Sequence, residues 1–171
     1  MIIRLTQKLG KKIHVSPTES LPLDPNPLAD WSAHLFTVGR KQYILVTNTA
    51  SLYSAVFSGG GVSNQARLLD RMLSAIREVM DDDGLIHLYE QFVEPSSDTV
   101  EFSKAFSRSV TGSMNDHIFA AKFLIGEDGL SLQKTSSMLN DTPLSAIKYH
   151  NARIAIQNLG EQRNCPNPFS P

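Results

Sequence analysis

Residues 21–54 read LPLDPNPLADWSAHLFTVGRKQYILVTNTASLYS and hold the clearest structural pattern in the 171-residue chain. Ala33–Val38 and Gln42–Thr47 both have the β-branched and aromatic content of strands, and Gly39-Arg40-Lys41 between them has the length and the glycine of a hairpin loop. A third strand, Leu52–Phe57, follows the turn-forming residues Asn48-Thr49-Ala50. Three consecutive strands predict an antiparallel meander.

The chain before this meander divides into a strand, a helical turn and an extended segment. Ile2–Leu5 is short, apolar and rich in isoleucine, which favours a buried strand, and Thr6 is suited to cap a helical turn through Lys12. Four prolines between Val15 and Asp30 remove backbone donors and hold their neighbours extended; they are Pro17, Pro22, Pro25 and Pro27. We therefore expect this segment to cross the surface.

Beyond the meander the spacing of apolar residues is helical, except in one short stretch. Gly59-Gly60-Gly61 ends the β region, and Ser63 is expected to cap the next helix. The helix that Ser63 caps is predicted to end near Gly84. Further helices are predicted over 85–93, 110–125, 130–139 and 142–159. Residues 99–103 alternate in polarity and predict a further strand. Gly160 is expected to stop the last helix, although alternating isoleucines leave a strand open over 146–158.

This order of elements predicts an α+β fold. The antiparallel sheet is expected to come mainly from the N-terminal third, plus the strand near 99–103, and to pack against helices from the C-terminal two-thirds. The length and the 41% hydrophobic content suit one domain, which we place at 1–160. Residues 161–171 are expected to form a flexible proline-rich tail.

Charge and cysteine content narrow the classes of function. Sixteen Lys and Arg residues against seventeen Asp and Glu give a formal charge of -1, so nucleic acid is not an expected partner. The single cysteine, Cys165, allows no intramolecular disulfide and fits a reducing cytoplasm. The sequence shows neither a signal-peptide pattern nor a run of apolar residues long enough for a membrane span. We expect a cytoplasmic protein with no membrane partner.

No familiar motif for a metal, a cofactor or a covalent intermediate stands out. The five histidines are far apart, so no metal site is predicted. Ser131 and Lys134 have the Ser-x-x-Lys spacing, but the other elements of that enzyme class are missing. Gly59-Gly60-Gly61 lacks the Lys-Ser/Thr of a phosphate loop, and three successive carboxylates at Asp81-Asp82-Asp83 do not converge on one ion. No cofactor is predicted.

The polar stretch Arg108–Asp116 is the most unusual part of the helical region. Gly112 lies inside it, where a glycine costs about 1 kcal/mol relative to alanine. This glycine permits close packing of another backbone, or it marks a break at which Ser113 caps a helix and Asp116 completes a capping box. A small polar pocket is the functional interpretation. The candidate binding residues are Trp31, His34, Arg108, Ser113, Asn115 and Asp116.

Several stretches resemble an uncharacterised bacterial domain family. They are IIRLTQKL at 2–9, LPLDPNP at 21–27, WSAHLF at 31–36, RKQYILVTN at 40–48, RSVTGSMND at 108–116 and LNDTP at 139–143. The resemblance covers about residues 1–150. The same kind of domain is similar to a region of some plasmid ORF-3-like proteins. It implies a bacterial cytoplasmic domain of unknown function and supplies no catalytic or binding residues.

Three functional hypotheses follow. The first is a non-enzymatic binding or interaction module with a protein partner or a second copy of itself, because no catalytic constellation is evident. The second is a small enzyme or a nucleotide- or anion-binding protein, with a site between the Trp31–His34 strand and the Arg108–Asp116 segment. The third is a nucleic-acid-associated accessory protein of a mobile element, which would use the N-terminal Lys and Arg residues with Arg40 and Lys41.

Overall fold

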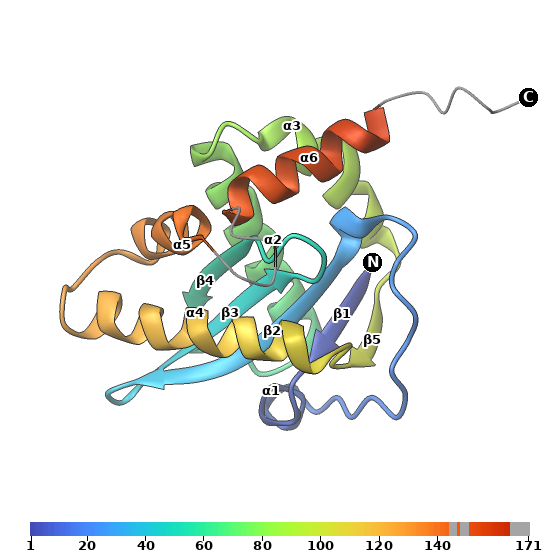
Figure 1. Ribbon diagram of the computed structural model, residues 1–171. Helices are drawn as coiled ribbons and strands as arrows, with labels where there is room; N and C mark the ends of the chain where they lie inside the picture. The colour runs from blue at the N-terminus through green and yellow to red at the C-terminus, as the bar shows by residue number, and fades with distance from the viewer. Residues whose placement is uncertain (144–146, 148–150, 165–171) are drawn as a thin grey trace, which may run out of the picture.

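The computed structural model of the chain describes residues 1–143, 147 and 151–164. A five-stranded sheet in the order β4-β3-β2-β1-β5 forms its centre (Figure 1). The strands are β1 (Ile2–Leu5), β2 (Asp30–Val38), β3 (Lys41–Asn48), β4 (Ser54–Ser58) and β5 (Glu101–Lys104). The helices are α1 (Gln7–Ile13), α2 (Gln65–Asp82), α3 (Ile86–Leu88), α4 (Arg108–Gly126), α5 (Leu132–Asp141) and α6 (Ala152–Asn164). Short turns, η1 (Pro27–Ala29), η2 (Tyr89–Val93) and η3 (Pro95–Asp98), complete the chain.

The α+β class and the β2-β3-β4 meander are confirmed. Both meander pairings are antiparallel, with His34 opposite Leu45 and Leu45 opposite Val56. The sheet is mixed rather than antiparallel throughout, because β1 lies between β2 and β5 and is parallel to both. These two pairings join residues 28 and 99 positions apart, and local sequence patterns carry no signal for them.

Alternating side chains of the sheet build two apolar layers. Trp31, Ala33 and Leu35 of β2 belong to the larger core, which includes α1, α2 and α6. Phe36 of β2 and Leu45 of β3 point to the opposite face and pack under α4 and α5. In Figure 1, α4 crosses one face of the sheet and α2 lies behind the other.

Both edges of the sheet are covered. At β4, Asn140 of α5 accepts from the Ser54 amide at 2.7 Å and donates to the Ser54 carbonyl at 3.0 Å. The Ser136 hydroxyl accepts from the Val56 amide at 2.9 Å. At β5, the Lys104 amide donates to the Glu19 carbonyl at 3.0 Å. These contacts occupy backbone groups that another chain would need to add a strand.

Several predicted helix boundaries are wrong. Asn64, not Ser63, caps α2, and its side chain accepts from the Arg67 amide at 2.9 Å. Thr142 ends α5 instead of starting the last helix, and Asn151 accepts from the Ile154 amide to start α6. The strand alternative is excluded for 152–158, whereas 144–146 and 148–150 lie outside the described residues.

Gly160 does not stop the last helix. The helix α6 continues to Asn164, so residues 161–164 of the predicted tail are helical, and 165–171 lie outside the described residues. A Cβ atom at Gly160 would lie 2.3 Å from Cδ2 of buried Leu88. The glycine therefore allows α6 to pack closely on α3.

Candidate functional site

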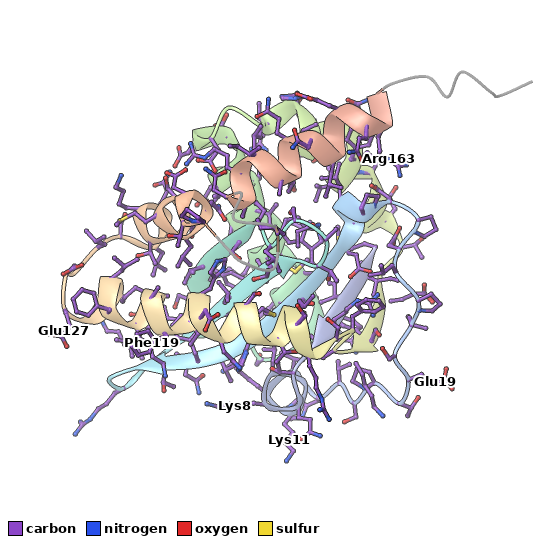
Figure 2. The ribbon with its side chains drawn as sticks, viewed as in Figure 1. Lys8, Lys11, Glu19, Phe119, Glu127 and Arg163 are labelled. Carbon is purple, nitrogen blue, oxygen red and sulfur yellow. The ribbon has the colours of Figure 1, made fainter. Side chains whose placement is uncertain are left out.

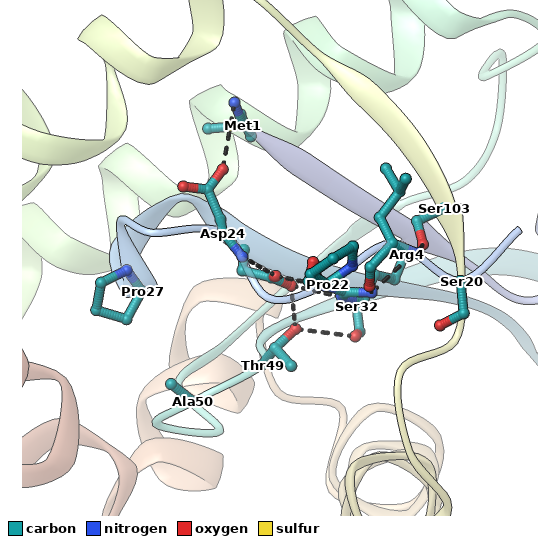
Figure 3. A network of polar contacts seen from close by, with 12 residues as sticks. Met1, Arg4, Ser20, Pro22, Asp24, Pro27, Ser32, Thr49, Ala50 and Ser103 are labelled. Carbon is teal, nitrogen blue, oxygen red and sulfur yellow. Dashed lines mark hydrogen bonds and ion pairs between the residues drawn. The ribbon is translucent and has the colours of Figure 1, made fainter.

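A buried ion pair fastens the proline-rich segment, residues 15–29, to the sheet (Figure 3). Arg4 and Asp30, each 1% exposed, form two hydrogen bonds of 2.7 Å. The guanidinium also donates to the carbonyls of Leu21 and Pro22 at 2.9 Å, and the Thr49 hydroxyl donates to Asp30 at 2.7 Å. Arg4 is thus a structural residue, and its charge does not belong to the surface cluster that the nucleic-acid hypothesis invokes.

The segment that this ion pair holds forms one wall of a crevice of about 790 Å³. The crevice lies outside the carboxyl ends of β1 and β5, where the chain leaves β1 toward α1 on one face and β5 toward α4 on the other. In sheets of parallel strands, ligands commonly bind where the connections from two adjacent strands lead to opposite faces of the sheet. The lining residues are Leu5, Thr6, Gln7, Gly10, Lys11, Val15, Ser16, Pro17, Lys104 and Ala105.

The crevice combines apolar walls with two ammonium groups and one unused hydroxyl. Leu5, Val15 and Pro17 supply apolar surface, while Lys11 and Lys104 are exposed and bring positive charge from α1 and β5. The Oγ1 atom of Thr6 is buried and has no hydrogen-bond partner among the described residues. A buried polar atom without a partner is uncommon in a native structure and often indicates a missing ligand or water.

Gly10 shapes the inner wall of the crevice. Its backbone carbonyl accepts from the Val15 amide at 2.9 Å, and His14 adopts the left-handed conformation that turns the chain back. A Cβ atom at Gly10 would lie 2.5 Å from the Val15 carbonyl oxygen. Only glycine lets the proline-rich segment fold this closely over α1.

Positive side chains collect at this end of the sheet. Because β1, β2 and β5 are parallel, the residues that follow them lie at the same end. Exposed basic residues on the elements around the crevice are Lys8, Lys11, Lys104 and Arg108, whereas Arg40 and Lys41 lie at the hairpin tip, because β2 continues five residues beyond the end of β1. Lys8 and Lys11 extend from α1 beneath the sheet in Figure 2. Several cations therefore lie around the crevice, although the formal charge of the chain is -1.

The structure does not bring the six sequence-predicted site residues together. Trp31 is fully buried on the α2 face, and its indole N–H donates to the Leu28 carbonyl at 2.8 Å. His34 lies on the opposite face, and its pKa is lowered by burial and by Lys8 and Lys122. Arg108 and Asn115 line a hollow of about 380 Å³ at the start of α4. Ser113 is buried under α4, and Asp116 is exposed.

Neither explanation offered for Gly112 holds. The helix α4 runs through it without a break and is capped by Ser107, whose hydroxyl accepts from the Val110 amide at 3.2 Å. A Cβ atom at Gly112 would meet no atom of the described residues within 4 Å, so no backbone in that part of the chain packs against it. The capping-box prediction for Ser113 and Asp116 is wrong because helix formation begins six residues earlier.

The remaining motifs have structural roles. The Ser131 hydroxyl accepts from the Lys134 amide at 3.2 Å, so the Ser-x-x-Lys spacing is that of a helix cap. The Asp81-Asp82-Asp83 carboxylates diverge, since Asp83 pairs with Tyr53 and Arg153 while Asp82 contacts Gln133. Among the described residues, no three His, Cys, Asp or Glu side chains are grouped to hold a metal ion.

A serine and a histidine also meet in the interior. Ser54 Oγ lies 2.9 Å from His117 Nδ1, and Ser54 also contacts the Thr47 hydroxyl at 2.8 Å. Burial lowers the pKa of His117 to about 4. Ser54 is 0% and His117 2% exposed, so this pair is closed to a substrate and joins α4 to the sheet.

Sequence reasoning missed the crevice because its residues have no motif. Thr6, Lys11 and Lys104 are unremarkable in the sequence, and only the pairing of β1 with β5 brings them together.

No helix in the described part of the chain is long and apolar enough to span a membrane.

Comparison with known proteins gives a family and no activity. No curated protein matches the chain. The model of a domain of unknown function, DUF6933, matches residues 2–155, which include every strand of the sheet, the crevice and most of the helices. Because that match covers far more than half of the 171 residues, the chain belongs to the DUF6933 family.

Proposed function

We propose that this chain is a binding module for a small organic anion, which occupies the crevice between α1, β5 and the proline-rich segment. The observation that supports it best is the combination of an apolar cavity of about 790 Å³ with Lys11, Lys104 and the unpartnered Thr6 hydroxyl. Small-molecule sites typically have this size, mostly apolar walls and a few polar groups that fix orientation.

The arrangement defines the ligand class. A carboxylate or phosphate group lies between the two ammonium groups, and an apolar body packs on Leu5, Val15 and Pro17. The Thr6 hydroxyl donates to an oxygen of the ligand, which satisfies its hydrogen-bonding capacity. A concave apolar cavity suits a small molecule better than a nucleic acid strand, which needs an extended basic groove with stacking aromatics.

The origin and the cellular location of the protein are a separate proposal. The resemblance to a region of plasmid ORF-3-like proteins supports a bacterial origin, and the single cysteine in the sequence supports a cytoplasmic location. A binding module without catalysis follows the first of the sequence hypotheses, whereas its anionic ligand comes from the second, with the site moved to the crevice.

The test is a binding screen on the full chain, read out by thermal shift and native mass spectrometry. The panel contains aliphatic and aromatic carboxylates, their neutral amides, organic phosphates, inorganic phosphate and an oligonucleotide. We expect carboxylates or phosphates with apolar bodies to raise the Tm and the neutral amides to have no effect. Response to the oligonucleotide alone, or to no member of the panel, would overturn the proposal.

Variants assign the binding to the crevice. Lys11→Met and Lys104→Met should each weaken binding about tenfold, whereas Lys134→Met on α5 serves as the matched control. Thr6→Val removes the unpartnered hydroxyl, so the free protein should be equally or more stable, while its affinity for the ligand should fall. Equal binding by all these variants would place the ligand elsewhere.

A further inference from the structure

Residues 15–18, which we call the strap, form the part of the proline-rich segment nearest α1 and are held only at their two ends. The first amide of the strap donates to the Gly10 carbonyl at 2.9 Å. Directly after the strap, the Glu19 carbonyl accepts from the Lys104 amide at 3.0 Å. Between these two contacts, residues 16–18 form no hydrogen bond or ion pair with any residue that the structure describes. The strap is therefore a short span between two anchors.

The rest of the proline-rich segment is fastened to the sheet. Glu19, labelled in Figure 2, marks the point where the strap ends. Two residues later the Leu21 amide donates to the Ser103 hydroxyl at 2.9 Å, and Arg4 donates to the carbonyls of Leu21 and Pro22. Movement of the segment without loss of these contacts is thus confined to the strap.

Open space borders the strap in two directions. Val15, Ser16 and Pro17 line the crevice of about 790 Å³. They also line a second hollow of about 410 Å³, which extends toward Glu101 and Phe102 of β5. Because packing in protein interiors leaves few voids larger than a water molecule, a span bordered by two hollows has few contacts that hold it in one position. The strap can shift toward either hollow.

The turn before the strap has an uncommon backbone conformation. His14 has φ 59° and ψ 39°, in the left-handed region that a residue with a side chain seldom adopts. Hinges of moving segments are typically a few residues in loops or at the ends of helices, which absorb the change in backbone angles. His14, directly after α1, is suited to this role.

The strap carries groups that complement a bound anion. The Ser16 hydroxyl and backbone amide are both donors, and neither has an acceptor among the described residues. Val15 and Pro17 are only partly buried, so their apolar surface is stabilised by contact with a ligand. On the facing walls of the crevice, Lys11 and Lys104 supply positive charge. Closure toward the crevice therefore brings donors and apolar surface to the same ligand.

We propose that the strap closes over the anion bound in the crevice, and that Ser16 then donates to the anionic group through its hydroxyl and its amide. The inference rests on the proposed function, because it concerns the same site. Pro17 packs on the apolar body of the ligand, while both anchors of the strap stay in place. Closure excludes water from the anion and slows its release. The second hollow gives the strap room to open for entry.

The experiment follows the exchange of backbone amides with solvent by NMR in the full chain. The probes are phenyl phosphate and benzoate, which each join an anionic group to an apolar ring, and inorganic phosphate, which has no apolar body. The Ser16 amide should exchange rapidly in the free chain, because it has no acceptor among the described residues. Phenyl phosphate or benzoate should slow its exchange about tenfold or more, and inorganic phosphate should slow it less. The Lys104 amide, bonded to Glu19 in both states, is the internal control.

The outcomes distinguish this inference from the proposed function. A rise in Tm with phenyl phosphate or benzoate, without slower exchange at Ser16, would show that the anion binds and the strap stays open, which overturns the strap proposal alone. Slow exchange at Ser16 in the free chain would also overturn it. No effect of both aromatic anions on the Tm and on Ser16 would refute the closure, and the rest of the binding panel would then decide the proposed function.

Pro17→Gly tests whether the strap must be ordered to bind. Glycine gives the open strap more conformations to lose on closure, so affinity for phenyl phosphate should fall about two- to fivefold. Affinity for inorganic phosphate should not change, because Pro17 contacts only the apolar body. Pro25→Gly is the matched control, since Pro25 lies in the same segment and outside the crevice. Equal effects of the two glycine variants would contradict closure of the strap.

Ser16→Ala tests the contact with the anionic group. It should weaken the binding of both phenyl phosphate and inorganic phosphate about fivefold, because the hydroxyl is lost while the amide remains. Ser109→Ala, an exposed serine of α4 outside the crevice, is the control. Both serines are exposed, so neither change should affect folding. Wild-type affinity in Ser16→Ala would refute the role assigned to the Ser16 hydroxyl.

Discussion

Removal of the Arg4 guanidinium is the most informative perturbation of the fold. Arg4→Met keeps the length of the side chain but leaves Asp30 as a buried carboxylate, 1% exposed, for which the described residues provide only the Thr49 hydroxyl and the Asp24 amide as donors. Loss of one partner from a buried ion pair typically costs about 3–5 kcal/mol. We expect a loss of this size in the free energy of unfolding.

The only tryptophan provides the assay. Trp31 is fully buried, so its fluorescence reports urea unfolding of the larger core. For a chain of this size, about 3–5 kcal/mol corresponds to a fall in Tm of roughly 6–20 °C. Lys104→Met, an exposed change on the neighbouring strand, should cost less than about 0.5 kcal/mol.

A double-mutant cycle with Asp30→Asn separates the ion pair from the other contacts. Asp30→Asn alone leaves the Arg4 charge buried, whereas Arg4→Met/Asp30→Asn removes both charges and keeps an acceptor for Thr49. The double variant should be more stable than the sum of the single losses by about 2 kcal/mol or more. A loss below about 1 kcal/mol for Arg4→Met, or simple additivity in the cycle, would refute the reasoning.

Three further outcomes are expected. Gly160→Ala should destabilise the chain by about 1–3 kcal/mol in urea unfolding, because its Cβ atom would meet buried Leu88 at 2.3 Å; an increase in stability would show that Leu88 can move aside. His117 binds its proton only near pH 4 in the native state but near 6.5 in the unfolded chain, so stability should fall by up to about 3 kcal/mol as the pH drops between these values. The pH dependence should be shallower for His117→Gln, and an unchanged slope would contradict the assignment. Asn140→Ala should expose the β4 edge and increase thioflavin T-positive aggregation relative to Lys134→Ala on the same helix; equal aggregation would show that Asn140 does not protect the edge.

The β2-β3-β4 meander and the existence of the main helices could be predicted from the sequence, because these features depend on local periodicity and turn residues. Ala33–Val38 alternates between two faces, and α2 places apolar residues on one side of the helix. The positions of helix ends were less accurate, since neighbouring residues such as Ser63 and Asn64 are both suitable caps. Gly160 was misread for a related reason, because a glycine that ends a helix and one that admits a close neighbour look the same in sequence.

The candidate site was beyond prediction for a different reason. Trp31 and His34 are three residues apart in one strand, so they point to opposite faces and cannot share a pocket with the Arg108–Asp116 segment. The crevice needs β1 and β5 side by side, and pairing over such a distance depends on how the whole sheet assembles.

Local patterns in the sequence were sufficient to predict the α+β class, the β2-β3-β4 meander and the helices α2 and α4, because side-chain periodicity and short turns between neighbouring strands depend on residues close in the chain. Tertiary structure alone decided the parallel placement of β1, the burial of Arg4 against Asp30 and the gathering of Lys11 and Lys104 around an apolar cavity. These features join residues distant in the chain, and their free energies arise only when desolvation, ion pairing and close packing occur together in the folded state.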